Sequence, residues 1–307
     1  MSTPADDGFR MPAEWEPHER CWMAWPCREQ SWGGELEAAR EAYAAVAKAI
    51  AAFEPVTMIA NPPEVAAASL SCGAGVEVLS LPHDDSWTRD TGPSFVTGAG
   101  GRVAGVDWRF DGWGGLVDRY DQDAALASRV LAHLEMPRYP VPLGFEGGAI
   151  HVDGEGTGLT TEAVVLDPRR NPGLGRVEAE AVLRAHLGLE KLIWLGQGLE
   201  DDDTGGHVDN VACFARPGVV LLLQAAEDDP NRARLEDNFD RLRGAIDAKG
   251  RELEVHRLAQ PPRRDRRVGR RMPLSHINFY LANGALIMPV FEHQETDTAA
   301  RRSLAQL

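Results

Sequence analysis

Cysteine is scarce in this sequence, and its few copies lack the spacing of a metal site or a disulfide framework. The four copies are Cys21, Cys27, Cys72 and Cys213, without a C-x-x-C pair or a repeated interval. Zinc knuckles and small disulfide-rich secreted domains both need such intervals, so the sequence argues against both classes. We expect four reduced thiols, as is usual in the cytoplasm.

The sequence also lacks long apolar runs and an excess of positive charge. No stretch approaches the ~18 apolar residues of a membrane span, and the N-terminus MSTPADDGFR has no basic segment followed by an apolar one. The chain has 32 Lys and Arg against 47 Asp and Glu, a formal net charge of −15. A surface of this sign repels a nucleic-acid backbone and attracts a small cation. We therefore expect a cytoplasmic protein with neither nucleic acid nor membrane as partner.

Four segments have the apolar spacing of amphipathic helices in this chain of 307 residues, whose composition is that of a globular protein. In the first, Glu35–Phe53, no Gly or Pro occurs and five apolar residues fall on one face. The others are Asp121–Leu134, Arg176–Leu187 and Asn231–Asp247. Each is followed by a short strand, such as Val56–Ala60 after the first helix.

Paired apolar or alternating runs precede the later helices and predict pairs of strands. The pairs are Ser94–Val96 with Val103–Phe110, Ala149–Val152 with Gly158–Leu166, Val208–Ala215 with Val219–Gln224, and Ile277–Ala282 with Leu286–Val290. The order strand, strand, helix, strand thus recurs at intervals of roughly 60 residues, which indicates an internal repeat. The motifs GGAIHVD and GGHVD begin 58 positions apart, at 147 and 205. A chance similarity between two glycine-rich turns is the alternative explanation.

This repeat predicts a single α/β domain whose units pack around a common axis, as radial blades or a closed ring. The loops that follow the last strand of each unit would then gather at one end of that axis. Three of them, residues 83–93, 144–148 and 196–210, carry most of the chemically active side chains. The fourth, Leu258–Met272, contains PPRRDRRVGRR and reads as an exposed solvated loop, with a regulatory or partner role as the alternative. The last unit ends with a helix-like run, Asp297–Leu307, and by this pattern lacks one strand and one loop.

Four side chains in these loops are candidates for chemistry. Asp90 precedes the turn TGP, and Glu146 is followed by two glycines that would let a ligand approach the backbone. Their alternative roles are to cap a turn and to accept hydrogen bonds from nearby amides. His207 and Asp209 would face the same way on a predicted strand, and the acids Asp201–Asp203 would raise the pKa of His207 and favour its protonated form. Taken alone, His207 could equally be a core histidine.

Two tryptophans, Trp87 and Trp113, could form apolar or cation-π walls around a cationic ligand. Carboxylates, a histidine and aromatic rings together suit a planar guanidinium, which pairs with carboxylates at two points. A protonated His207 could deliver a proton to a leaving amine. What the set lacks is a nucleophile.

Five motifs give the sequence a clear resemblance to agmatine deiminases of the peptidyl-arginine deiminase type. They are RMPAEWEPHERCWMAWP at Arg10–Pro26, DDSWTRDTGP at 84–93, FEGGAIHVDGEGTGLTTE at Phe145–Glu162, DDDTGGHVDN at Asp201–Asn210 and SHINFYLANG at Ser275–Gly284. The resemblance runs from about residue 10 to the end. It implies the pentein fold, a five-fold pseudo-symmetric α/β propeller of repeated ββαβ units. It also implies hydrolysis of agmatine to N-carbamoylputrescine and ammonia, in polyamine metabolism, without cofactor or metal.

The resemblance also implies a role for each candidate residue. Asp90 and Asp209 would clamp the guanidinium, His207 would be the general acid and base, and Glu146 would support the histidine. The substrate tail must be read by residues near the pocket mouth, for which Trp87, Trp113 and the Arg10–Arg20 segment are candidates that the resemblance does not assign. A cysteine would attack the guanidinium carbon, ammonia would leave, and water would release the amidino-thioether intermediate.

The chain departs from the family pattern at two places. The family cysteine follows a glycine-rich turn after a final strand, a segment absent here, and none of the four cysteines replaces it. Cys213 reads as a core residue. We therefore expect a catalytic domain truncated before the nucleophile loop. At position 205, relatives often have Asp or Asn where this chain has Gly205, so we expect a local hydrogen bond to be missing.

Three alternative functions stay open at this point. The chain could deiminate peptidyl or free arginine, or bind guanidines and polyamines without catalysis. It could also be a metal-dependent hydrolase that holds a divalent ion with His151, Asp153, His207, Asp209 and the Asp201–Asp203 run. Oligomeric state is not readable from the sequence, and a homo-oligomer is an open arrangement.

Overall fold

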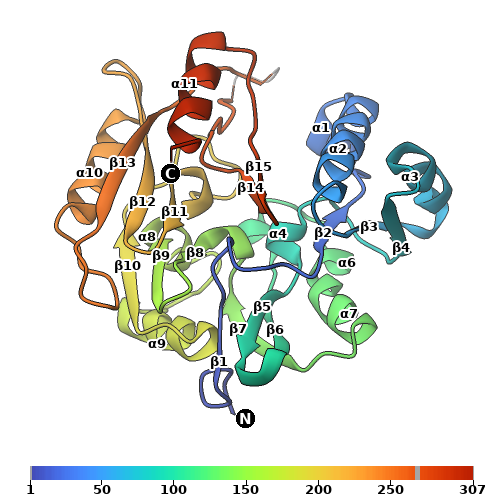
Figure 1. Cartoon of the computed structure of the whole chain (residues 1–307), viewed down its shortest axis with the longest axis horizontal. Coiled ribbons are helices and arrows are strands. Elements are labelled where there is room, and N and C mark those ends of the chain that lie inside the picture. Colours follow the sequence, from blue (N-terminus) through green and yellow to red (C-terminus); the bar gives the residue numbers. More distant parts are fainter. Residues whose placement is uncertain (1, 267–269, 307) are drawn as a thin grey trace.

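The computed structural model describes residues 2–266 and 270–306, and within that part of the chain the strands form five separate sheets of an α/β fold (Figure 1). Three of the sheets have the same construction. Two antiparallel strands are followed by a helix and then by a strand parallel to the second one. The predicted order strand, strand, helix, strand is thus confirmed for these units.

The bounds of the three similar units are as follows. The first has β5 (Ser94–Gly98), β6 (Arg102–Arg109), α7 (Leu126–His133) and β7 (Arg138–Gly144). The second has β8 (Ile150–Val152), β9 (Thr157–Thr161), α9 (Arg176–Leu187) and β10 (Lys191–Leu195). The third has β11 (Ala212–Arg216), β12 (Val219–Gln224), α10 (Arg232–Leu242) and β13 (Glu254–Ala259).

The first and last sheets differ from this pattern. The N-terminal sheet is parallel throughout, and its elements are β2 (Cys21–Ala24), α1 (Glu29–Trp32), α2 (Leu36–Ala51), β3 (Val56–Ala60), α3 (Val65–Cys72) and β4 (Val76–Ser80). The C-terminal hairpin consists of β14 (Tyr280–Ala282) and β15 (Ala285–Ile287), and α11 (Gln294–Leu304) follows it. β15 packs against α2, so the last unit returns to the first (Figure 1).

The residues before β2 connect several of these units. β1 (Phe9–Arg10) pairs with β5 in antiparallel fashion, and the amide of Met11 donates to the carbonyl of Leu187 in α9. Further along, the amide of His18 donates to Asn283 Oδ1 at 2.9 Å, and Asn283 Nδ2 donates to the His18 carbonyl at 2.8 Å. The N-terminal segment therefore joins the first and second of the three similar units to the C-terminal hairpin.

Helix α2 lies where the sequence predicts it, and its buried face is the predicted one only in part, since Ile50 and Tyr43 pack in the core while Val46 is exposed. Its buried residues are Ala39, Ala44, Ala47 and Ile50. Of the predicted apolar stripe, Phe53 is 49% exposed and lies beyond the helix. Alanines let the helix approach the fully buried strand β3 closely, so the small residues form the contact and the larger ones flank it.

Four other predicted elements need correction. The segment Asp121–Leu134 is two helices, α6 (Asp121–Ala124) and α7, with a break at Ala125. Helix α10 ends at Leu242 rather than Asp247. The strand predicted from Val208 begins only at Ala212, because residues 208–210 form the 3-10 turn η4 (Val208–Asn210). Similarly, the run after Gly158 leaves the sheet at Thr161 and continues as α8 (Glu162–Val165).

No helix in residues 2–266 or 270–306 combines the length and apolar character of a membrane span.

Candidate functional site

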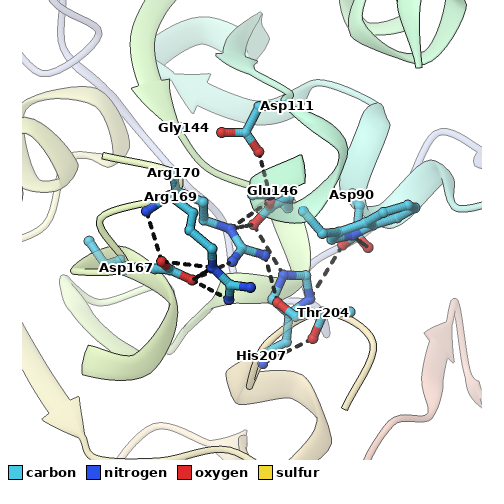
Figure 2. Close-up of polar contacts among 12 residues, drawn as sticks. Asp90, Asp111, Gly144, Glu146, Asp167, Arg169, Arg170, Thr204 and His207 are labelled. Atoms are coloured by element: carbon cyan, nitrogen blue, oxygen red, sulfur yellow. Dashed lines mark hydrogen bonds and ion pairs between the residues drawn. The ribbon is translucent and has the colours of Figure 1, made fainter. Parts of the chain in front are cut away.

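Four side chains from three loops gather at one site, and three of them surround Gly148; Figure 2 labels Asp90, Glu146 and His207. Asp90 lies in α4 (Thr88–Thr91), Glu146 follows β7, and His207 and Asp209 flank the start of η4. A Cβ atom added to Gly148 would lie 2.5 Å from His207 Nδ1, 2.5 Å from Asp209 Oδ2 and 2.8 Å from Asp90 Oδ1. Only glycine leaves room for these three groups, and the sequence prediction that the loops gather at one place is confirmed for these residues.

His207 lies between two carboxylates. Its Nε2 is 3.2 Å from Glu146 Oε2, and its Nδ1 is 3.7 Å from Asp90 Oδ1. Burial alone would lower the pKa of His207, but Asp90, Glu146 and Asp209 together raise it to about 9. The imidazole is therefore protonated at neutral pH. Although His207 sits before a 3-10 turn rather than on the predicted strand, its charge state is as predicted.

The cause of that charge is not the run Asp201–Asp203, as the sequence suggested. Asp203 forms ion pairs with Arg266 and Arg270, and Asp201 accepts the amide of Arg271 at 3.1 Å. Asp202 Oδ1 accepts from the amide and hydroxyl of Thr204, at 2.9 and 2.8 Å. Asp203 is thus paired with the basic loop, and Asp202 shapes the turn that leads to His207.

Among the described arginines of that basic loop, the expectation of a solvated surface fails for Arg271. Arg271 is buried and donates from both Nη atoms to the two carboxylate oxygens of Asp229, at 2.7 Å each. Arg263 and Arg264 are exposed, as expected. Part of the loop, residues 267–269, lies outside the described residues.

The two candidate clamps differ in their hydrogen bonds. Asp90 Oδ2 accepts from Trp113 Nε1 at 2.9 Å, and its Oδ1 accepts from the amide of Gly148 at 3.1 Å, so Asp90 does not cap its own turn. Asp209 Oδ1 is buried without a hydrogen-bond donor. Removal from water raises the pKa of both carboxyls, and for Asp209, which Asp90 and Asp202 also oppose, it reaches about 7. Asp209 therefore presents a free acceptor to a cation.

The two tryptophans take different positions. Trp113 is buried with φ at 58°, packs edge-on against Phe110 and holds Asp90 through its ring nitrogen. Trp87 is 40% exposed and stacks on Trp32, with ring centroids 5.6 Å apart. Its link to the site is its carbonyl, which accepts the amide of Asp90 at 3.0 Å. The structure thus makes Trp113 an orienting donor, and ligand contact remains a prediction for both rings.

Arg170 is a member of the site that the sequence did not reveal. Its side chain is fully buried, and its Nε donates to both oxygens of Glu146, at 2.9 and 3.2 Å. Burial would raise the pKa of Glu146, but His207 and Arg170 lower it, so the carboxylate stays ionised. In the sequence, Arg170 stands in DPRRNP, a turn-forming run that gives no indication of burial.

A second unforeseen pair lies at the edge of the site. Glu14 Oε1 is 2.5 Å from Arg89 Nη2, and Glu14 Oε2 is 3.6 Å from His151 Nε2. Burial would raise the pKa of Glu14, yet Arg89 and His151 lower it. The charge of Arg89, next to Asp90 and Asp209, is therefore offset by Glu14, within the Arg10–Arg20 segment expected at the mouth.

Gly205 faces Arg170. A Cβ atom there would lie 3.3 Å from Arg170 Nη1, which is buried without an acceptor in hydrogen-bond contact. An acceptor at this position would lie within reach of that nitrogen, and the expected loss of a hydrogen bond relative to other family members stays a prediction.

None of the four cysteines has the properties of a nucleophile. Burial raises the pKa of Cys21 to about 11, that of Cys27 to about 12 and those of Cys72 and Cys213 above the ordinary thiol value. A reactive cysteine needs a lowered pKa. Cys213 is 2% exposed within a hydrophobic cluster, as predicted for a core residue.

The residues proposed as metal ligands do not converge. His151 Nδ1 accepts the amide of Phe214 at 3.2 Å, and Asp153 Oδ1 accepts the amides of Glu155 and Thr157 at 2.8 Å each. Among the residues that the structure describes, no group of three His, Cys, Asp or Glu is placed to hold a metal ion.

Comparison with known proteins places this chain among deiminases. The family described as Porphyromonas-type peptidyl-arginine deiminase matches residues 10–307. The agmatine deiminase of Pseudomonas aeruginosa (strain LESB58) is 43% identical, over 100% of this chain and 89% of its own. The solved agmatine deiminase of Enterococcus faecalis is 36% identical with a TM-score of 0.93, covering 100% and 90% of the two chains. A Cys-to-Ser variant of the C. jejuni agmatine deiminase, solved with substrate bound, is 25% identical with a TM-score of 0.85, covering 97% and 88%.

Proposed function

Because this chain belongs to the Porphyromonas-type peptidyl-arginine deiminase family, we propose that it hydrolyses agmatine to N-carbamoylputrescine and ammonia in polyamine metabolism. The observation that carries the proposal is the pairing of a protonated His207 with carboxylates on several sides and a free acceptor on Asp209. A guanidinium group offers the donors that Asp209 lacks, in a planar arrangement that pairs with carboxylates.

Each residue then has a defined role. Asp90, oriented by Trp113, and Asp209 hold the guanidinium, and Trp87 forms part of the mouth. A cysteine thiolate attacks the guanidinium carbon, and one nitrogen takes a proton from His207 and leaves as ammonia. The neutral imidazole, held by Glu146, then takes a proton from water. The water oxygen bonds to the carbon, the C–S bond breaks, and N-carbamoylputrescine is released.

The attacking thiol, in this proposal, is none of the four cysteines, since burial raises the pKa of each. Residues 1–307 form one catalytic domain that supplies the clamps and the proton carrier. Its five sheets are the blades of the five-fold pentein propeller, with the unit of β14 and β15 as the incomplete one. The acidic surface and the unpaired thiols support a cytoplasmic location.

Calorimetry with agmatine, putrescine and arginine tests the guanidinium pocket on the 307-residue chain. We expect agmatine to bind and putrescine, which lacks the guanidinium, to bind at least tenfold more weakly, a loss of about 1.4 kcal/mol. Equal binding of the two would refute the proposal. Tighter binding of arginine would instead favour a deiminase of free or peptidyl arginine.

Ammonia release by the same chain distinguishes the chemical alternatives. If agmatine binds and no ammonia is released, either the attacking thiol is not among the four cysteines or the chain only binds its ligand. Release that iodoacetamide abolishes would mean that one of the four is the nucleophile, and release that a chelator abolishes would indicate a metal-dependent hydrolase. If binding occurs without ammonia release, agmatine turnover is measured on the protein purified from its own host. Turnover there would indicate an enzyme, and its absence would indicate a purely binding role.

A further inference from the structure

Arg170 enters the site from a rigid turn between α8 and α9. Its amide donates to the Asp167 carbonyl at 3.0 Å. The next residue, Asn171, donates to the carbonyls of Gly144 and Val165 and accepts the amide of Gly144 at 2.8 Å. Gly144 ends β7, two residues before Glu146. The turn that carries Arg170 is therefore fixed to the strand that carries Glu146.

The guanidinium of Arg170 connects two different loops of the site. Its Nε donates to Glu146, and its Nη2 donates to the carbonyl of Thr204 at 2.6 Å (Figure 2). No hydrogen bond or ion pair joins Arg170 to Asp90 or Asp209 in the described structure. The guanidinium thus contacts the supports of the proton carrier and, through Nη1, Asp167 Oδ2 of its own turn at 3.6 Å, but not the clamps.

Glu146 and Thr204, the two partners of Arg170 outside its own turn, in turn hold His207. Glu146 Oε2 contacts the imidazole Nε2 at 3.2 Å, and Thr204 Oγ1 accepts the backbone amide of His207 at 3.2 Å. We propose that Arg170 is a positioning residue for deimination, which fixes the side chain of His207 through Glu146 and its backbone through Thr204.

The chemistry of the side chain favours this role over a purely structural one. A buried cation costs free energy unless it is well paired, and a planar guanidinium can serve two acceptors in fixed directions. A lysine ammonium keeps the charge but is a point donor without that geometry. By keeping Glu146 ionised, Arg170 also leaves the carboxylate only as an acceptor, so the proton between Glu146 and His207 stays on the imidazole.

The test uses Arg170→Lys, which keeps the charge, and Thr204→Val, which removes the acceptor of the His207 amide. Hydrogen exchange of the 307-residue chain measures the loop directly. We expect both variants to lose protection at residues 204–210 and to keep it in β2, β3 and β4. Unchanged exchange at 204–210 in a folded Arg170→Lys variant would overturn the proposal, whatever the reaction is.

Kinetics of the natural protein give the second readout, and only this part rests on the proposed function. For Arg170→Lys we expect kcat on agmatine to fall about 10²-fold with KM within about twofold, because proton transfer is misplaced while the clamps are intact. The double variant should lose less than the product of the two single losses. A matched fall in affinity, or full additivity, would show a general structural role instead.

Arg271→Lys is the matched control. Arg271 is also a buried arginine with a two-point carboxylate partner, Asp229, but its side chain does not contact Glu146 or Thr204. We expect this variant to lower the free energy of unfolding and leave kcat unchanged. A fall in kcat equal to that of Arg170→Lys would mean that any buried arginine has this effect, and would overturn the assignment to Arg170.

Discussion

Two of the glutamate–histidine pairs in the described part of this molecule differ in what surrounds them. In one, Glu54 contacts His18 Nδ1 at 3.3 Å, and in the other Glu146 contacts His207 Nε2 at 3.2 Å. Glu54 also receives the hydroxyl of Tyr280 at 2.5 Å and the amide of Asn283 at 2.7 Å. Both its oxygens are thus occupied, and the cluster fastens the end of α2 to the C-terminal hairpin.

The pair at His207 lies instead among more acceptors than donors. Asp90 and Asp209 add two carboxylates, and Asp209 Oδ1 finds no donor in the described structure. Buried acceptors without donors cost stability, so natural proteins retain them where a ligand supplies the donors. The same two residue types therefore form a structural joint in one place and a ligand site in the other, and the balance of donors and acceptors distinguishes them.

The largest expected contrast is in turnover. His207→Gln removes the proton carrier, and we expect agmatine turnover by the natural protein to fall about 10³-fold. His18→Gln should leave turnover unchanged, because His18 contacts only the structural cluster. A similar loss in both variants would erase the functional distinction between the pairs.

The second contrast is an opposite change in stability. The pKa of Asp209 is raised from 3.8 to about 7 in the folded chain. The free energy of unfolding therefore falls as the pH rises between these two values, because the unfolded chain ionises more readily than the folded one. Asp209→Asn should therefore raise the free energy of unfolding at pH 8 by roughly 1–3 kcal/mol. Glu54→Gln should lower it by about 3 kcal/mol, since it weakens three buried hydrogen bonds. Urea unfolding of both variants measures the signs, and equal signs would contradict this interpretation.

A smaller contrast concerns the pH dependence of binding. A guanidinium needs ionised clamps, and Asp209 loses its proton only near pH 7. We expect agmatine affinity to rise about tenfold per pH unit below pH 7 and to level above it. Calorimetry on Asp209→Asn should show weaker binding with a shallower pH dependence, because Asp90 alone still titrates. Glu54→Gln serves as the control, and a shallower dependence there would point to a general effect of charge.

The smallest expected effect comes from filling the open donor of Arg170. Gly205→Asn places an amide oxygen near Nη1, and we expect it to be more stable than Gly205→Ala by about 1 kcal/mol. Asn also tolerates positive φ better than Ala, and φ is 79° at Gly205. Gly100 has φ at 74° and open space around it. The stability difference between Gly100→Asn and Gly100→Ala therefore measures the backbone preference of Asn without a hydrogen bond. An equal difference at the two positions would show that no hydrogen bond forms.

The sequence predicted the order of elements and the four converging side chains, because both are written in local patterns. Apolar spacing located α9 to the residue. The turn before His207 was misread, since HVDN alternates like a strand while Gly205 and Gly206, with φ at 79° and 117°, turn the chain. Arg170 and Glu14 were not foreseen, because their partners lie 24 and 75 positions away, at Glu146 and Arg89. No local pattern records a contact of that range.

The connection between His18 and Asn283 has a consequence for the timing of folding. These residues are 265 positions apart, so their hydrogen bonds close a loop of almost the whole chain. Such closure is slow and occurs late, after the units between have formed. Glu14 lies four residues before His18, and we expect its pairing with Arg89 in the same late step. Pulsed hydrogen exchange during refolding, with Asn283 protected last, would show that ring closure and completion of the site are one kinetic event.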